Sequence, residues 1–165
     1  MKDFLFRKAQ LSDVPILVEI YMKKLLKDFS WDITMQKMFQ ERYKEYIPRL
    51  MKKETLVVYL AYQQETLVGM AEIYIWGKEI AEEEATLSSI YVLPELRENN
   101  MIKQLFFMLL QEAKKRNCTV IKTLANGNRE QLYQLGFQDT YDEEGNGLSN
   151  GMELKISLKN FKNML

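Results

Sequence analysis

Residues 88–116 have the sequence SSIYVLPELRENNMIKQLFFMLLQEAKKR, and this stretch decides the fold of the chain. Its first residues are rich in β-branched and aromatic side chains, which is typical of a strand. The residues after position 100 are strongly apolar at helical spacing. A charged turn joins the two. Such a turn presents backbone N–H groups at a helix N-terminus, where phosphate commonly binds, although this turn contains no glycine.

The elements on either side of this unit are predicted from hydrophobic spacing and turn residues. A break is expected in the second helix near Pro48, because proline lacks a backbone N–H. The predicted order is strand 4–9, helices 11–29 and 34–53, strands 55–63, 66–76 and 84–93, helix 100–116, strand 118–125, helix 128–136, and strands 137–144 and 151–158.

Composition limits the class of protein. The 165 residues predict one domain over residues 1–165, and 47% hydrophobic with 28% charged residues is typical of a globular protein. Lys+Arg and Asp+Glu both number 23, which gives no case for a nucleic-acid partner. The sequence has no apolar run long enough to span a membrane and no apolar signal at its start. We therefore expect a cytoplasmic protein without a membrane or nucleic-acid partner.

Histidine is absent from the sequence, and Cys118 is its one cysteine. These facts exclude Ser-His and Cys-His nucleophile pairs, an intrachain disulfide and the common His-rich metal sites, so no metal is expected. Cys118 is interpreted as a small buried residue, since no histidine can activate it. Acid–base chemistry is left to Glu, Asp, Tyr, Lys, Cys, water or the backbone.

Two segments carry a family resemblance. Residues 88–116 contain a V-x-P-x-x-R pattern at Val92, Pro94 and Arg97, and residues 124–137 read LANGNREQLYQLGF. With the element order, these segments resemble the GNAT superfamily of acetyl-CoA-dependent N-acetyltransferases over almost the whole chain. The resemblance implies an α/β (α+β) fold with helices on both faces of a mainly antiparallel sheet. It also implies a parallel strand pair, residues 84–93 and 119–124, that splays apart near Val92.

The turn differs from the family pattern R-x-x-G-x-G/A, because Asn100 and Ile102 stand at the two glycine positions. The phosphate donors are backbone groups, so a changed side chain does not remove them. Asparagine is among the better substitutes if a left-handed conformation is needed. Ile102 could crowd the cofactor unless its side chain points into the core. The resemblance implies acetyl-CoA as co-substrate, with contacts from Tyr91, Val92, Arg97, Glu98, Asn99, Asn100, Met101, Ile102, Lys103, Asn126 and Tyr133.

The implied reaction is direct attack of a primary amine on the thioester. Tyr133 stands where many members place the acid for the leaving thiolate, and a phenol, with an ordinary pKa of about 10, suits this task. Val92 stands at the position where the family has the backbone N–H donor to the thioester oxygen. Asn126 stands at the position of the family residue that reaches the pantetheine arm. Either Glu84 or Glu72 is the candidate base, with water or a tyrosine as alternatives. Tyr133 could instead be packing, and Asn126 a turn cap.

The acceptor is a small-molecule amine or a protein amine, and the sequence does not distinguish them. In the family, the helical region 11–53 lines the acceptor pocket, and the protein is expected to be a monomer or a homodimer. Two other readings remain. One is a non-catalytic GNAT-fold protein that binds CoA or a partner. The isoleucine at a glycine position, Ile102, and the lack of a clear base favour this reading. The other is an interaction subunit with an aromatic surface and no cofactor.

Overall fold

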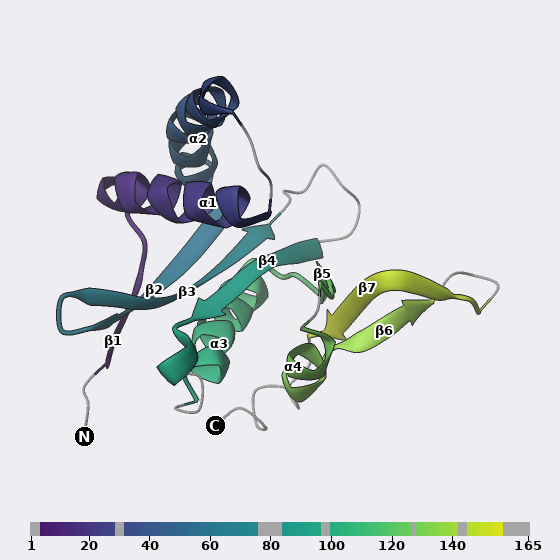
Figure 1. Cartoon of the computed structure of the whole chain (residues 1–165). Helices are drawn as coiled ribbons and strands as arrows, with labels where there is room; N and C mark the ends of the chain where they lie inside the picture. The colour runs from purple at the N-terminus through teal and green to yellow at the C-terminus, as the bar shows by residue number, and fades with distance from the viewer. Residues whose placement is uncertain are drawn as a thin grey trace. The chain divides into compact units, whose positions relative to one another are not determined.

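The computed structural model describes residues 4–28, 32–75, 84–96, 100–126, 128–141 and 145–156. The helices and strands follow the predicted order, with two short 3-10 turns added (Figure 1). The chain divides into two compact units, Ala9–Leu56 and a unit that combines Met1–Lys8 with Val57–Leu165. The expectation of one domain stays a prediction. Within the described ranges, no helix is long and apolar enough to cross a membrane.

The unit Ala9–Leu56 is a pair of helices, α1 (Val14–Asp28) and α2 (Ile33–Lys52). A 3-10 turn, Leu11–Asp13, precedes α1, and the Asp13 carboxylate accepts the backbone N–H of Gln10 at 2.7 Å. Asp32 begins α2 by accepting the N–H of Met35 at 2.9 Å, which satisfies one of the helix's unpaired donors. The rings of Tyr21 and Tyr43 pack together across the two helices, with centroids 5.6 Å apart.

The predicted break at Pro48 is wrong, because α2 continues through Pro48 to Lys52. Proline removes a single backbone donor, and Pro48 lies close to the end of the helix. Its neighbours Ile47 and Leu50 are both buried, so the apolar face of the last turns is continuous across the proline. Burial of this face therefore outweighs the lost hydrogen bond.

The second unit contains a seven-stranded sheet with the strand order β1-β2-β3-β4-β5-β7-β6 (Figure 1). The pairs β1–β2, β3–β4, β5–β7 and β6–β7 are antiparallel, and β4–β5 is parallel. The predicted mixed, mainly antiparallel sheet is thereby confirmed. The strands are β1 (Phe4–Lys8), β2 (Leu56–Gln63), β3 (Thr66–Ile75), β4 (Glu84–Val92), β5 (Val120–Leu124), β6 (Gln138–Tyr141) and β7 (Gly147–Lys155).

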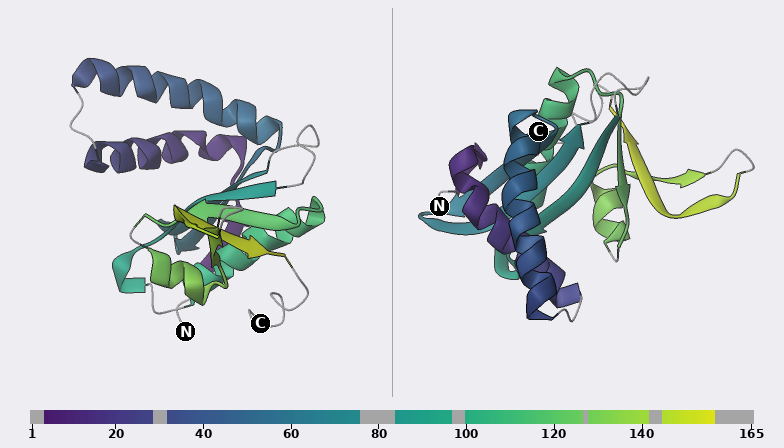
Figure 2. Two further views of the ribbon diagram at one scale, coloured as in Figure 1. Left: turned by 90° about the vertical axis from the view of Figure 1, so that its right-hand side faces the viewer. Right: turned by 90° about the horizontal axis from the view of Figure 1, so that it is seen from above.

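Helix α3 (Met101–Lys115) is the crossover between the parallel strands β4 and β5. It lies with α4 (Arg129–Gln134) on the same face of the sheet (Figure 2). The ring of Phe106 in α3 packs against Phe137, which follows α4, at 5.5 Å between centroids. The apolar face of α3 that is buried in this core comprises Met101, Leu105, Phe106, Leu109, Leu110 and Ala113.

Both ends of α3 are flanked by an asparagine in the left-handed conformation. Asn100 precedes the helix with a φ of 56°, and Asn117 follows it with a φ of 60°. At the C-terminal end, Asn117 donates its backbone N–H to the Lys114 carbonyl at 2.9 Å, and Cys118 donates to Ala113 at 3.0 Å. These bonds satisfy carbonyls that a helix end otherwise leaves unpaired. Cys118 is buried, as predicted.

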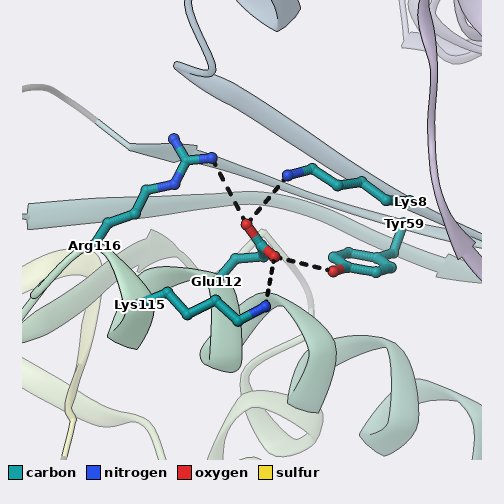
Figure 3. Close-up of polar contacts among 5 residues, drawn as sticks. All are labelled: Lys8, Tyr59, Glu112, Lys115 and Arg116. Atoms are coloured by element: carbon teal, nitrogen blue, oxygen red, sulfur yellow. Dashed lines mark hydrogen bonds and ion pairs between the residues drawn. The ribbon is translucent and has the colours of Figure 1, made fainter.

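A buried carboxylate holds the C-terminal half of α3 to β1 and β2 (Figure 3). The side chain of Glu112 is 9% exposed. It accepts hydrogen bonds from the Lys8 ammonium at 3.2 Å, the Tyr59 hydroxyl at 3.3 Å and the Lys115 ammonium at 3.3 Å. The Arg116 guanidinium lies 3.6 Å away. We call these five residues the Glu112 cluster.

Charge and burial set the protonation of the Glu112 cluster. Burial acts to raise the pKa of Glu112, but hydrogen bonds and charge from Lys8 and Lys115 lower it below its ordinary value. Burial, then the charge and hydrogen bond of Glu112, raise the pKa of Tyr59 to about 12. Glu112 is therefore ionised and Tyr59 protonated near neutral pH, which are the forms that the hydrogen bonds require.

The predicted splay of β4 and β5 is confirmed. The two strands pair at Glu84–Val120, Ala85–Ile121 and Thr86–Lys122. The Thr123 hydroxyl then donates to the Leu87 carbonyl at 2.8 Å. Beyond that point β4 continues to Val92 beside β3, while β5 continues beside β7.

Candidate active site

A cavity of about 420 Å³ lies where β4 has separated from β5. Its walls come from the end of β4, the first turn of α3 and the first turn of α4, three segments that are separate in the sequence. Of the residues predicted from the sequence, Tyr91, Val92 and Ile102 line it. The remaining lining residues are Ile90, Asn128, Glu130 and Gln131.

The end of β4 directs backbone groups toward this cavity. The N–H of Leu93 donates to the carbonyl of Val68 in β3 at 2.9 Å. Adjacent residues of a strand direct their N–H groups to opposite edges, so the N–H of Val92 is directed to the edge from which β5 has departed. The Val92 side chain is itself buried. This orientation is the one required of a backbone donor in the cavity.

Gly69 in β3 pairs with Val92 and allows β4 and α3 to approach closely. A Cβ atom at Gly69 would lie 3.1 Å from the Tyr91 carbonyl oxygen and 3.3 Å from Leu105 Cδ1. Both distances are tighter than ordinary packing, so any side chain here would displace the end of β4 or the start of α3. The sequence analysis did not identify Gly69, because its closeness to Leu105 is set by the tertiary fold.

Asn100 places the start of α3 beside the cavity. It adopts the left-handed conformation with φ 56° and ψ 8°, which asparagine tolerates better than most residues. Its carbonyl accepts the N–H of Gln104 at 3.0 Å, so the N–H groups of residues 101–103 precede the intrahelical ladder. Met101 is buried and Lys103 is exposed. The predicted cofactor residues Arg97, Glu98 and Asn99 lie outside the described residues.

Ile102 contributes to both the core and the cavity. Its side chain is partly buried against the cluster that contains Leu105 and Phe106. It also forms part of the cavity wall. The expectation that it points into the core is therefore met in part, and crowding of a ligand by Ile102 stays a prediction.

Tyr133 lies on α4 and is 46% exposed. It is not among the lining residues; its hydroxyl donates instead to Asp139 Oδ2 in β6 at 2.6 Å. The Arg129 guanidinium forms an ion pair with the other oxygen of Asp139. A hydrogen bond with Tyr133 is the largest influence that raises the pKa of Arg129, and the Asp139 charge adds to it. Asn126, the predicted pantetheine contact, is exposed just after β5.

The two candidate bases lie on neighbouring strands, Glu72 in β3 and Glu84 at the start of β4. Glu72 in β3 is 2% exposed, and its carboxylate accepts a hydrogen bond from the Ser88 hydroxyl at 2.7 Å. The β3–β4 register shifts at this point, so Ser88 occupies a bulge just beyond the β4–β5 pairs. Glu84 lies within those pairs and forms an ion pair with Lys122 at 2.5 Å. Glu72 is thus the candidate nearer the open part of β4.

Comparison with known proteins agrees with this geometry. The model of the GNAT acetyltransferase family matches residues 18–137, most of the chain. The chain belongs to the GNAT family. Comparison with curated proteins found no match.

Solved GNAT-type structures share the fold of this chain. A predicted acetyltransferase with acetyl-CoA from Clostridium acetobutylicum is 24% identical, with a TM-score of 0.70 over 86% of this chain and 93% of that one. The PaiA N-acetyltransferase from Thermoplasma acidophilum, in complex with coenzyme A, is 18% identical, with a TM-score of 0.65 over 93% and 99%. The ribosomal-protein-S18-alanine N-acetyltransferase from Escherichia coli is 19% identical, with a TM-score of 0.60 over 94% and 96%.

Several residues of this candidate site could not be predicted from the sequence. Asn128, Glu130 and Gln131 lie within the segment that carried the resemblance, but nothing in their identity marked them as lining residues. Asp139 was missed because its contact with Tyr133 depends on how β6 lies beside α4. Among the described residues, no group of three or more His, Cys, Asp or Glu side chains is arranged to hold a metal ion.

Proposed function

We propose that this GNAT protein transfers an acetyl group from acetyl-CoA to a primary amine by direct attack. The observation that carries the proposal is the splay of β4 from β5, with a cavity of about 420 Å³ at the start of α3. The cavity places a strand edge, a helix N-terminus and α4 around one space. Solved relatives of the same fold contain CoA or acetyl-CoA.

The residues present fit the co-substrate at the start of α3. The left-handed Asn100 provides the backbone conformation for which the family uses glycine. The first-turn N–H groups of Met101, Ile102 and Lys103 are assigned to the phosphates, together with the helix dipole. Tyr91, Arg97, Glu98, Asn99 and Asn126 complete the proposed binding set.

The proposed reaction leaves each proton accounted for. The amine nitrogen attacks the acetyl carbonyl carbon, a C–N bond forms and the C–S bond breaks. The amine loses one proton to a base, and the sulfur takes one proton from the phenol of Tyr133. Water returns a proton to the phenolate and removes one from the base. The backbone N–H of Val92 is assigned as the donor that stabilises charge on the carbonyl oxygen.

Glu72 is the preferred base over Glu84. Its carboxylate lies beside the open part of β4 and is oriented by Ser88, whereas Glu84 is paired with Lys122. A water molecule held by Glu72 could carry the proton instead. Glu72→Gln preserves shape and removes the charge, so a base at this position predicts a lower kcat with unchanged CoA affinity.

A second candidate function is a non-catalytic protein that binds CoA or a partner. Two observations favour it: isoleucine at position 102 lines the cavity where the family pattern has a glycine, and the Tyr133 proton is directed to Asp139. An interaction subunit without a cofactor is a third reading. Measured CoA affinity separates the third reading from the others, and turnover of an amine separates the first from the second.

The experiment has two stages. Calorimetry with CoA and acetyl-CoA tests binding, and Arg97→Glu should weaken it at low salt if the phosphates lie at this turn. A screen of polyamines, amino acids, aminoglycosides and peptides then tests transfer by detecting released thiol. Peptides belong in the screen because one structural relative acts on a ribosomal protein. Absence of CoA binding contradicts the proposal; binding without turnover favours the second candidate.

We infer a cytoplasmic protein with a small-molecule or protein amine as its partner, in keeping with a lone buried Cys118. A monomer or a homodimer fits equally, and sedimentation of the purified chain distinguishes the two.

A further inference from the structure

Asp139 joins the proposed acid to a second charged residue. The Tyr133 hydroxyl donates to Oδ2 of Asp139 at 2.6 Å, and Arg129 pairs with Oδ1 of the same carboxylate. An O–H donor this close to a carboxylate is typical of a charge-assisted hydrogen bond. Arg129 and Tyr133 are four residues apart on α4, so both project from one side of that helix.

The chemistry of a phenol limits what Tyr133 can do in this arrangement. A phenol carries one donor proton, and here that proton is directed to Asp139. It cannot be donated to a sulfur atom at the same time. If Tyr133 is the acid of the proposed reaction, the hydrogen bond to Asp139 must open before the proton is transferred.

We propose that Asp139 holds the proton of Tyr133 in the resting protein, and that Tyr133 becomes available as an acid only when this hydrogen bond opens. The inference rests on the proposed acetyl transfer. Asp139 acts through Tyr133 and touches no substrate. Arg129 keeps Asp139 in place through its ion pair, and its positive charge beside Tyr133 stabilises the phenolate after the proton has left.

The first turn of α4 contributes both to the cavity wall and to this arrangement. Asn128, Glu130 and Gln131 line the cavity, and Arg129 lies between them in the chain. A ligand that fills the cavity therefore contacts the turn that carries Arg129. Displacement of that turn changes the Arg129–Asp139 pair and, with it, the acceptor of the Tyr133 proton.

The proton transfer itself is balanced. When the hydrogen bond opens, the O–H of Tyr133 turns from Asp139 to the sulfur of the leaving group. The proton passes to sulfur as the C–S bond breaks, and the electron pair of that bond stays on sulfur. Water then returns a proton to the phenolate and removes one from the base, and the restored phenol donates to Asp139 again.

The kinetic test uses Asp139→Ala and the near-isosteric Asp139→Asn, each alone and combined with Tyr133→Phe. Removing the acceptor should raise kcat roughly tenfold or more, the equivalent of one hydrogen bond to a charged group. Asp139→Asn should raise it less, because the amide oxygen still accepts. Neither change should alter kcat in the Tyr133→Phe background. A lower or unchanged kcat in Asp139→Ala, or the same rise in both backgrounds, overturns the proposal.

A second measurement works even if no amine is turned over. Tyrosine can be replaced throughout by 3-fluorotyrosine, and the Tyr133 fluorine resonance is assigned from its loss in Tyr133→Phe. CoA should move this resonance toward its position in Asp139→Ala, while Tyr141, also exposed on β6, serves as the reference. A Tyr133 resonance that CoA leaves in place, although calorimetry shows binding, contradicts the proposal. If Tyr133→Phe turns over an amine at the wild-type rate, the acid assignment fails instead.

Discussion

The two ends of α3 are both flanked by a left-handed asparagine, yet their surroundings are opposite in kind. At the C-terminal end, Asn117 and the Glu112 cluster tie the helix to β1 and β2, and the cluster's carboxylate accepts hydrogen bonds from three residues. At the N-terminal end, Asn100 precedes a first turn in which Ile102 lines a cavity, and the first-turn N–H groups have no acceptor within the helix.

The difference shows how one helix can serve stability at one end and ligand binding at the other. A buried carboxylate stabilises a fold when every oxygen has its partners, as in the Glu112 cluster. Unpaired backbone donors at a helix N-terminus are useful to a protein when a ligand supplies the acceptors. Changes at the N-terminal end should therefore alter binding and rate, and changes at the C-terminal end should alter unfolding.

Tyr133→Phe should give the largest effect and should appear in rate rather than stability. Loss of a general acid typically lowers kcat about a hundredfold or more. CoA affinity should change far less, because the acid acts on the developing thiolate. Steady-state kinetics and calorimetry measure the two, and Tyr141→Phe is the matched control on a neighbouring exposed ring. A wild-type rate in Tyr133→Phe would make the residue structural.

Glu112→Ala should give the opposite pattern. Removing the carboxylate leaves Tyr59 and Lys8 without their acceptor, which costs about 1–3 kcal/mol in the free energy of unfolding. CoA affinity should stay the same. Urea unfolding provides the measurement, and Glu45→Ala is the control, since Glu45 pairs with Arg49 on an exposed helix surface. Equal losses for both variants would show that the Glu112 cluster adds nothing beyond a surface ion pair.

The two asparagines allow the comparison to be made at matched positions. Asn100→Ala and Asn117→Ala each place an alanine at positive φ, a conformation that alanine adopts less readily than asparagine. Each should lower the free energy of unfolding by about 1 kcal/mol. Asn100→Ala should also weaken CoA binding, and Asn117→Ala should not. Asn100→Gly should preserve both properties, because glycine adopts positive φ without steric cost. Equal CoA affinity in the two alanine variants would place the phosphates elsewhere.

Low pH should reduce the stabilisation that the Glu112 cluster provides at the C-terminal end of α3. The pKa of Glu112 is lowered in the folded protein, so its contribution is present above the ordinary glutamate value of about 4.3 and is lost as the pH falls below it. Glu112→Gln removes this titration. Melting temperatures measured from pH 6 downward should therefore fall less steeply in Glu112→Gln. Parallel curves for the two proteins would contradict a lowered pKa.

Ile102→Ala is expected to have the smallest effect. It removes part of the cavity wall and part of a side chain that packs on the core. CoA affinity should stay the same or improve if Ile102 crowds the ligand, while the melting temperature falls slightly. Weaker CoA binding in Ile102→Ala would mean that the isoleucine contacts the ligand favourably.

The sequence supported the element order and the splay because both depend on local patterns. The stretch from Ser88 to Arg116 contains a strand, a turn and a crossover helix, and a crossover makes the flanking strands parallel. The Glu112 cluster could not be predicted, since Lys8, Tyr59 and Glu112 are far apart in the chain. The Asp139 contact was missed for the same reason. The error at Pro48 came from weighing backbone hydrogen bonding without the buried face around it.

The splay has a further consequence for how the molecule opens in solution. Strands β1 to β4 form one group in the sheet, and β5, β7 and β6 form the other. The two groups are joined where β4 pairs with β5, through a short bridge of Glu84–Val120, Ala85–Ile121 and Thr86–Lys122. Proteins open locally in cooperative units of different stability, and we expect the two groups of strands to behave as two such units. Amides of β5, β6 and β7 should therefore exchange with deuterium as one group, faster than those of β2 and β3. If the two groups exchange separately, the short pairing that creates the cavity also acts as a hinge, about which the width of the cavity varies.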